Sequence, residues 1–157
     1  MRETVLRLAL YQPDIPQNAG SLMRLCACLD VAMDIIEPCG FLLTDRNFRR
    51  AGMDYREGVD LSRHENWETF RAKAPGRLLL LTTKSAQPYA GFAFQPSDTL
   101  ILGRESAGVP QSVHEAADER LLIPMRPGMR SINVAQAAAM VLGEALRQTD
   151  SFPGVLP

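Results

Sequence analysis

The 157-residue sequence is short of cysteine and of net charge, and each shortage excludes a class of protein. Its three cysteines, Cys26, Cys28 and Cys39, are an odd number without Cys-x-x-Cys spacing, so neither a disulfide framework nor a zinc knuckle is predicted. We expect all three to pack as small hydrophobic residues. A formal net charge of −1 argues against a protein that coats nucleic acid with a global positive field. Any contact with nucleic acid must therefore use a local basic patch.

Long apolar runs are also absent. The longest aliphatic run, Leu78 to Leu81, is far shorter than the ~20 residues of a membrane span. The first residues lead into a predicted strand rather than into the apolar region of a signal peptide. We therefore expect a cytoplasmic protein with a single domain over residues 1–157, in which about the last eight residues form a flexible tail.

Segments of strand type alternate with segments of helical periodicity. Strands are predicted at 5–10, 31–36, 78–83, 99–102 and 121–123, with a weaker one at 59–61 and a short element at 89–94. Helices are predicted from Asn18 to Leu29, at 45–53, 65–74 and 110–117, and after Ser131. The segment 78–83 is apolar on both faces, which is typical of a parallel sheet covered by helices. The sequence therefore predicts an α/β fold, a mostly parallel sheet with helices on both faces.

The first helix begins beside a loop that contains Pro13 and Pro16, and it carries two polar residues of interest. Asn18 can cap the helix. Arg24 lies about 200° around the helix from the apolar Leu22, so it points away from the core. The planar fork of an arginine suits phosphate or ribose oxygens, although a solvated arginine on a helix is an equally good interpretation of Arg24 alone.

Two later loops predict a pocket for a small polar ligand. The apolar run Leu100–Leu102 leads directly into Gly103-Arg104-Glu105-Ser106-Ala107-Gly108, which places the Glu105 carboxylate at the strand end where open α/β sheets bind ligands. The run Leu121–Pro124 leads into a loop and a helix that opens Ser131-Ile132-Asn133. Ser131 or Asn133 can cap that helix, and capping can coexist with ligand contact.

Arginines gather in two places. Arg46, Arg49, Arg50, Arg56 and Arg63 fall within eighteen residues, and Arg126 and Arg130 flank the loop before Ser131. The first cluster could equally be a solvated helix face. The second pair sits in a loop that should border the ligand.

Taken together, G-x-E-x-x-G at 103–108, I-P-M-x-P followed by S-x-N at 123–133, and the stretch from Pro13 through Asn18 to Arg24 resemble the three motifs of the SPOUT RNA methyltransferases. The order and spacing are similar to the SpoU branch over nearly the whole chain. The resemblance implies a SPOUT fold with a C-terminal trefoil knot, S-adenosyl-L-methionine bound in the knot, and a homodimer. Periodicity alone would not suggest a knot, because knots are very rare.

The same resemblance implies the site. Contacts to adenosylmethionine, largely through backbone atoms, would fall on Leu81, Gly103, Ile123 and Ser131, and the catalytic polar positions match Asn18, Arg24, Glu105 and Asn133. The implied reaction methylates the ribose 2′-hydroxyl of the wobble nucleotide, cytidine or uridine, in the anticodon stem-loop of tRNA, with leucine isoacceptors as the expected substrates. No metal is required.

Several alternatives remain open. The chain could methylate another tRNA or rRNA site, or could be a non-catalytic RNA-binding module that keeps the pocket. A hydrolase is disfavoured because Arg104 breaks the G-x-S-x-G register, and a nicotinamide oxidoreductase because no G-x-G-x-x-G follows the first strand. The last helix, apolar on nearly all sides from Val134 to Leu146, predicts cover by a partner subunit, with a central helix of the monomer as the alternative.

Overall fold

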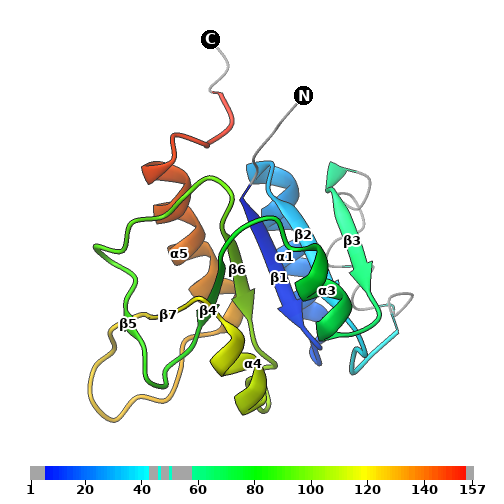
Figure 1. Ribbon diagram of the computed structural model, residues 1–157. Coiled ribbons are helices and arrows are strands. Elements are labelled where there is room, and N and C mark those ends of the chain that lie inside the picture. The colour runs from blue at the N-terminus through cyan, green and yellow to red at the C-terminus, as the bar shows by residue number, and fades with distance from the viewer. Residues whose placement is uncertain (1–5, 43–45, 47–49, 51–57, 155–157) are drawn as a thin grey trace.

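The computed structural model describes residues 6–42, 46, 50 and 58–154, which form one α/β sheet structure (Figure 1). Its elements are β1 (Arg7–Tyr11), α1 (Pro16–Leu29), β2 (Ala32–Ile36), β3 (Leu61–His64), α3 (Trp67–Lys73), β4 (Leu78–Leu81), β5 (Gln87–Pro88), β6 (Thr99–Leu102), α4 (Gln111–Ala116), β7 (Glu119–Leu122) and α5 (Val134–Gln148). The strands pair in the order β3-β2-β1-β6-β4-β7-β5, and every pairing between them is parallel. The predicted fold class is confirmed.

Later strands are inserted between earlier ones. Strand β6 lies between β1 and β4, and β7 lies between β4 and β5. The loops that follow β1, β4, β6 and β7 therefore leave the same edge of the sheet, because parallel strands end at a common edge. The trefoil knot implied by the resemblance remains a prediction.

The core lies on both faces of the sheet. Leu8 and Leu10 of β1 pack into the cluster formed with α1 and α5, whereas Ala9 and Tyr11 pack into the cluster formed with α3 and α4. Successive side chains of a strand point to opposite faces, so a sheet covered on both sides needs apolar residues at every position. Each aliphatic side chain buried in this way stabilises the fold by about 1.5–3 kcal/mol.

Some boundaries differ from the prediction. Helix α1 begins at Pro16, whose fixed φ suits a first helical position, and its N-cap is Ile15, which makes no side-chain capping bond. The expectation that Asn18 caps this helix is therefore wrong, because Asn18 already lies inside the first turn. The expectation that the cysteines pack as small hydrophobic residues is wrong for Cys28, which is exposed, whereas Cys26 is buried as predicted.

The remaining differences concern short elements. The weak strand expected at 59–61 is found as β3, Leu61–His64. The short element expected at 89–94 is replaced by β5 at Gln87–Pro88, followed by a turn. The helix predicted at 45–53 lies outside the described residues except for positions 46 and 50. No helix of the described chain is long and apolar enough to cross a membrane.

Helix α5 is covered mainly by its own chain. Ala138, Val141 and Leu146 are at most 1% exposed, packed with α1 and the sheet. Leu146, expected on the outer side, is part of this buried face. The exposed side keeps a narrower apolar strip that includes Ala139 and Met140. A homodimer remains a prediction, and substitutions at 138 or 141 would disturb the core of the monomer rather than an interface.

A buried ionic cluster joins the first three strands. Asp34 of β2, which is 2% exposed, accepts two hydrogen bonds from the Arg7 guanidinium at 2.8 and 2.9 Å. The Nε2 atom of His64 lies 2.8 Å from Oδ1 of the same carboxylate, the oxygen that also accepts from Nη2 of Arg7. His64 also stacks edge-on against Phe70 of α3, so the cluster ties the sheet to its covering helix.

We predict that Asp34→Ala lowers the free energy of unfolding by about 3 kcal/mol, because it leaves a mostly buried arginine without its partner. Urea denaturation followed by circular dichroism measures this loss. Glu37→Ala is the matched control, since its ion pair with Arg63 is exposed and should contribute less than about 1 kcal/mol. Equal losses in the two variants would contradict the role given to the cluster.

Candidate active site

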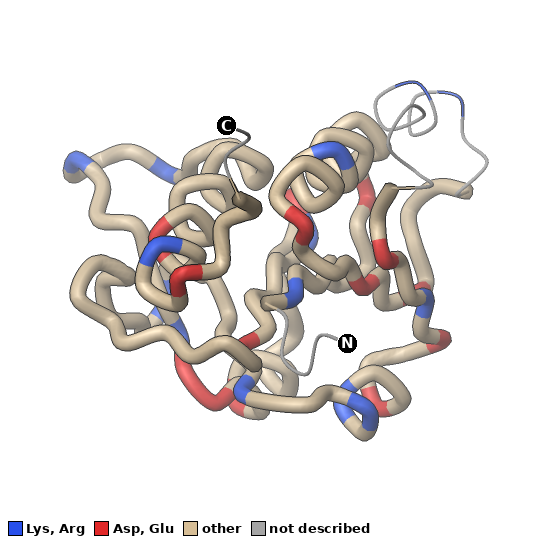
Figure 2. Tube along the Cα trace, turned by 90° about the horizontal axis from the view of Figure 1, so that it is seen from above, with Lys and Arg blue, Asp and Glu red and all other residues tan. Residues whose placement is uncertain are grey.

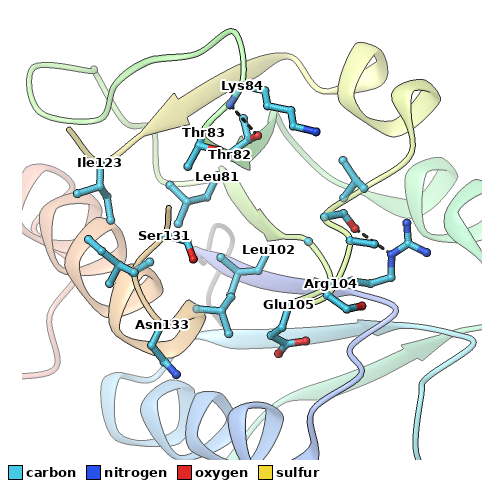
Figure 3. Close-up of a pocket in the computed structure, with 18 of the residues that line it drawn as sticks. Leu81, Thr82, Thr83, Lys84, Leu102, Arg104, Glu105, Ile123, Ser131 and Asn133 are labelled. Atoms are coloured by element: carbon cyan, nitrogen blue, oxygen red, sulfur yellow. Dashed lines mark hydrogen bonds between the residues drawn. The ribbon is translucent and has the colours of Figure 1, made fainter. Parts of the chain in front are cut away.

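A cavity of about 610 Å³ opens where β4, β6 and β7 end and α5 begins. Its walls come from the segments 81–84, 102–109 and 131–134 and from Ile123 and Met125, with Ile15 and Asn18 of the β1–α1 region along one side. Figure 3 shows Leu81, Leu102 and Ile123 around the space, with Glu105 and Asn133 on the side of α1. The register pairs Leu81 with Leu102, which places the two following loops side by side.

The loop at 103–108 closes on itself. The backbone N–H of Arg104 donates to the carbonyl of Gly108 at 3.1 Å, and the N–H of Gly108 donates back at 2.8 Å. A Cβ atom on Gly103 would lie only 3.0 Å from the backbone of Gly108, and Gly108 itself has a φ of +61°. Both positions therefore favour glycine, one for close approach and one for its backbone conformation.

Seven of the eight residues singled out in the sequence line this cavity: Asn18, Leu81, Gly103, Glu105, Ile123, Ser131 and Asn133. The eighth, Arg24, is exposed on α1 and is not among the lining residues of the cavity. The structure thus brings together all four positions predicted to contact adenosylmethionine and three of the four predicted catalytic positions.

Asn133 and Asn18 connect α5 to α1. The Oδ1 atom of Asn133, one of the two caps that the sequence allowed, accepts from the N–H groups of Ala135 and Gln136 at 2.9 and 3.3 Å. Its amide nitrogen donates to Oδ1 of Asn18 at 3.4 Å. The amide nitrogen of Asn18 in turn donates to Oε1 of Glu105 at 3.5 Å. A line of polar side chains therefore runs along one wall of the cavity.

Asp14 extends this line, although the sequence analysis gave it no role. One carboxylate oxygen accepts from the N–H of Glu105 at 3.2 Å, and the other accepts from the hydroxyl of Ser106. The N–H of Asp14 donates to Oε2 of Glu105 at 3.4 Å. Asp14 lies in the loop after β1, the strand that pairs with β6, and because this pairing is not visible in the sequence, no local signal marks Asp14.

The sequence analysis also gave no role to several residues that line the cavity. Thr82, Thr83 and Lys84 follow β4, and Gln111 and His114 belong to α4. The ring of His114 contacts the carbonyl of Lys84 at 3.1 Å, which joins two walls of the cavity.

The two carboxyl groups of the site differ in proton affinity. Burial, followed by the side-chain hydrogen bond with the Asp14 carboxyl group, raises the pKa of Glu105 from 4.5 to about 7, although the backbone N–H of Asp14 acts in the opposite direction. The hydrogen bonds from Glu105 and Ser106 lower the pKa of Asp14. Asp14 is therefore the ionised member of the pair, and Glu105 exchanges its proton near neutral pH.

In the part of the chain that the structure describes, basic positions are spread along the trace. Figure 2 shows Lys and Arg interspersed with Asp and Glu along the described chain. Of the first predicted cluster, Arg46 and Arg50 are exposed, and Arg63 pairs with Glu37 at 2.8 Å. Arg49 and Arg56 lie outside the described residues. Arg126 and Arg130 are exposed in the loop whose Met125 lines the cavity.

We predict a pH-dependent effect of Glu105→Gln on stability. Because the folded protein holds the Glu105 proton up to about pH 7 while the unfolded chain loses it near 4.5, this residue favours folding below pH 4.5 and loses that contribution as pH rises to about 7. Glutamine removes the dependence, so the variant should gain stability relative to the parent protein between pH 5 and pH 8. Urea denaturation midpoints of both proteins, measured at pH 5 and at pH 8, test this gain. If the difference in stability between variant and parent is the same at the two pH values, the raised pKa is contradicted.

Comparisons with known proteins agree with this geometry. The profile of the SpoU rRNA Methylase family matches residues 5–143. A protein of Beijerinckia indica named tRNA (cytidine(34)-2'-O)-methyltransferase is 61% identical over 152 residues, which cover 95% of each chain. A solved structure described as giving structural insights into the 2-OH methylation of C/U34 on tRNA is 37% identical, with a TM-score of 0.88 over 92% of this chain and 96% of that one.

A further solved structure is similar at lower identity. The SpoU methyltransferase AviRb from Streptomyces viridochromogenes, in complex with the cofactor AdoMet, is 25% identical and superposes with a TM-score of 0.81 over 94% of this chain and 62% of its own. The expected resemblance is therefore confirmed at the level of sequence and of fold. With a family profile that spans most of its length, this chain belongs to the SpoU rRNA Methylase family.

Proposed function

We propose that this protein is a tRNA 2′-O-methyltransferase that transfers the methyl group of S-adenosylmethionine to the ribose 2′-hydroxyl of the wobble nucleotide, cytidine or uridine. The observation that carries the proposal is the cavity at the ends of β4, β6 and β7, with Asn133, Asn18 and Glu105 aligned along one wall. The name of the Beijerinckia indica relative supports the substrate and the position.

The cavity suits adenosylmethionine. Its volume of about 610 Å³ lies within the range of sites for small ligands, roughly 300–1,000 Å³. Leu81 and Ile123 offer apolar walls for an adenine ring, and the backbone at Gly103 and Ser131 offers hydrogen-bonding groups. Adenosylmethionine supplies a methyl group on a sulfonium, and the cofactor in the AviRb structure supports this choice. None of the described residues form a metal-binding group.

The polar residues hold the ribose in place. Asn133 is fixed by its capping bonds, so its amide nitrogen has a defined direction toward Asn18. Neither amide can take up a proton, and we assign both to orienting the hydroxyl, which contributes mainly proximity. Arg24, exposed on α1, would hold an RNA phosphate and stabilise charge that develops on the ribose oxygen.

The RNA itself would bind through a local surface. Arg126 and Arg130 are exposed in the loop that borders the cavity, where they can meet the phosphates of an anticodon stem-loop. We infer that the enzyme acts as a homodimer in the cytoplasm and that leucine isoacceptors of tRNA are its substrates. Methylation of another RNA site and a non-catalytic binding module are the alternatives.

Two measurements test the proposal. Mass spectrometry of tRNA nucleosides from a deletion strain should show loss of 2′-O-methylation at the wobble position, and calorimetry should show binding of adenosylmethionine to the purified protein. Binding of adenosylmethionine without any methylation of tRNA would favour the non-catalytic module. Loss of methylation at a different nucleotide would identify another RNA site.

We predict that Gly103→Val keeps the fold but weakens adenosylmethionine binding by at least about tenfold. The added Cβ would press on the Gly108 backbone at 3.0 Å and on Val109, so the loop that forms one wall must shift. Calorimetry measures the affinity, and circular dichroism checks the fold. Unchanged titration heats in a folded variant would exclude this loop from the binding site.

We predict that Arg24→Ala lowers the turnover of tRNA methylation by roughly 10²-fold or more, while the affinity for adenosylmethionine stays nearly unchanged. Lysine at this position should rescue poorly, because it keeps the charge and loses the planar fork. Transfer of tritiated methyl groups to unmodified tRNA measures the turnover. Arg71→Ala, an exposed arginine of α3, is the control, and equal activities of the two variants would remove Arg24 from the mechanism.

A further inference from the structure

Asp14 and Glu105 meet because their strands are neighbours. Strand β1 pairs with β6, with Leu10 opposite Leu102, so the loops that follow the two strands run side by side. Three hydrogen bonds join these loops around the two carboxyl groups: from the N–H of Glu105 to Asp14, from the hydroxyl of Ser106 to Asp14, and from the N–H of Asp14 to Glu105. Asp14 receives two donors, and its carboxylate is held firmly.

The Glu105 carboxylate is held less tightly. Its two oxygens receive one donor each, from Asn18 at 3.5 Å and from the N–H of Asp14 at 3.4 Å, both near the upper limit for a hydrogen bond. None of the ion pairs in the described part of the chain involves this residue. Glu105 lines the cavity, so it can still accept a proton from a group bound there.

The charged group that faces Glu105 is Asp14, from the β1–α1 loop. Asn18 of α1 and Asn133 of α5 present uncharged amides. Arg104 is adjacent in the chain, but its guanidinium donates to the carbonyl of Gly108 at 2.9 Å and lies 5.5 Å from the centre of the Tyr11 ring. Figure 3 shows the Arg104 and Glu105 side chains pointing in different directions.

We propose that Glu105 accepts the proton of the ribose 2′-hydroxyl, and that Asp14 is the positioning residue that holds Glu105 for this step. This inference rests on the proposed methyltransferase function. The 2′-oxygen forms a bond to the methyl carbon as its proton passes to an Oε atom of Glu105, while the carbon–sulfur bond breaks and its electron pair stays on sulfur. The sulfonium charge and the carboxylate charge are both lost, and the neutral Glu105 then returns its proton to water.

Elimination among the neighbouring groups supports Glu105. Asn18 and Asn133 have no basic atom, and the guanidinium of Arg24 does not lose its proton in proteins. His114 is the rival base, because it also lines the cavity, although its Nε2 atom contacts the Lys84 carbonyl. Glu105, with a pKa of about 7, has the proton affinity at which a general base works best near neutral pH.

Single-turnover methylation of tRNA, measured from about pH 5 to pH 9, tests the assignment. We expect the rate for the unmodified protein to rise with pH and then to level off. Glu105→Gln should lower the methylation rate by roughly 10²-fold or more, and its remaining rate should not rise with pH. Asp14→Asn should move the rise to lower pH and reduce the plateau, because a carboxylate without its anionic neighbour is a weaker base. His114→Gln should keep the rise.

A second readout does not depend on activity. The carboxyl carbon of Glu105, followed by NMR in the ligand-free protein, should titrate at lower pH in Asp14→Asn than in the unmodified protein. Glu68→Gln, an exposed residue of α3, controls for the change in net charge and should leave the Glu105 titration unchanged. Calorimetry should show unchanged affinity for adenosylmethionine in the Asp14 and Glu105 variants. If these residues only supported the structure of the cavity, the substitutions would weaken this binding.

The outcomes separate the two proposals. If the unmodified protein binds adenosylmethionine and methylates no tRNA, the proposed function fails, and this inference fails with it. If it methylates tRNA and Glu105→Gln keeps both the rate and its rise with pH, only the assignment of Glu105 fails. If His114→Gln abolishes the rise, His114 is the base instead. An unmoved Glu105 titration in Asp14→Asn would overturn the role of Asp14.

Discussion

Strand β6 is hydrogen-bonded to β1 on one side and to β4 on the other, and the geometry of the site depends on this position. The pairing with β4 brings the loop after Leu81 beside the loop that begins at Gly103. The pairing with β1 brings the Asp14 loop beside Glu105. One strand therefore aligns the wall that would hold adenosylmethionine with the wall that carries the polar side chains. The glycines of the loop after this strand allow the two walls to approach closely.

Much of this arrangement can be predicted from residues near one another in the chain. Apolar runs such as 99–102 identify strands, and the S-x-N stretch before α5 narrows the cap to Ser131 or Asn133, of which the structure shows Asn133. Strand order cannot be predicted in this way, because nothing local to β6 indicates that it inserts between β1 and β4. For the same reason the contact between Asp14 and Glu105, 91 positions apart in the chain, could not be foreseen.

Asn18 shows how a backbone detail changes the interpretation of a side chain. The sequence suggested a cap, because asparagine before an apolar periodic segment usually is one. Pro16 begins the helix instead, and no side chain caps its end. The Asn18 amide is thereby left to bridge Asn133 and Glu105, whereas Asn133 caps its own helix with one atom and contacts Asn18 with another.

The two carboxylates on either side of β1 show why location alone does not decide function. Asp34 is more deeply buried than Glu105, yet a bidentate arginine and a histidine surround it, so its charge is compensated and it serves the fold. The neighbour of Glu105 is a second carboxylate, that of Asp14, whereas the neighbour of Asp34 is an arginine. Burial next to a negative charge disfavours its ionised form, and the cost of ionising it is what makes it a stronger base. A carboxyl group left without a cation at the wall of a cavity is therefore suited to proton transfer, while the same group beside arginine is suited to holding strands together.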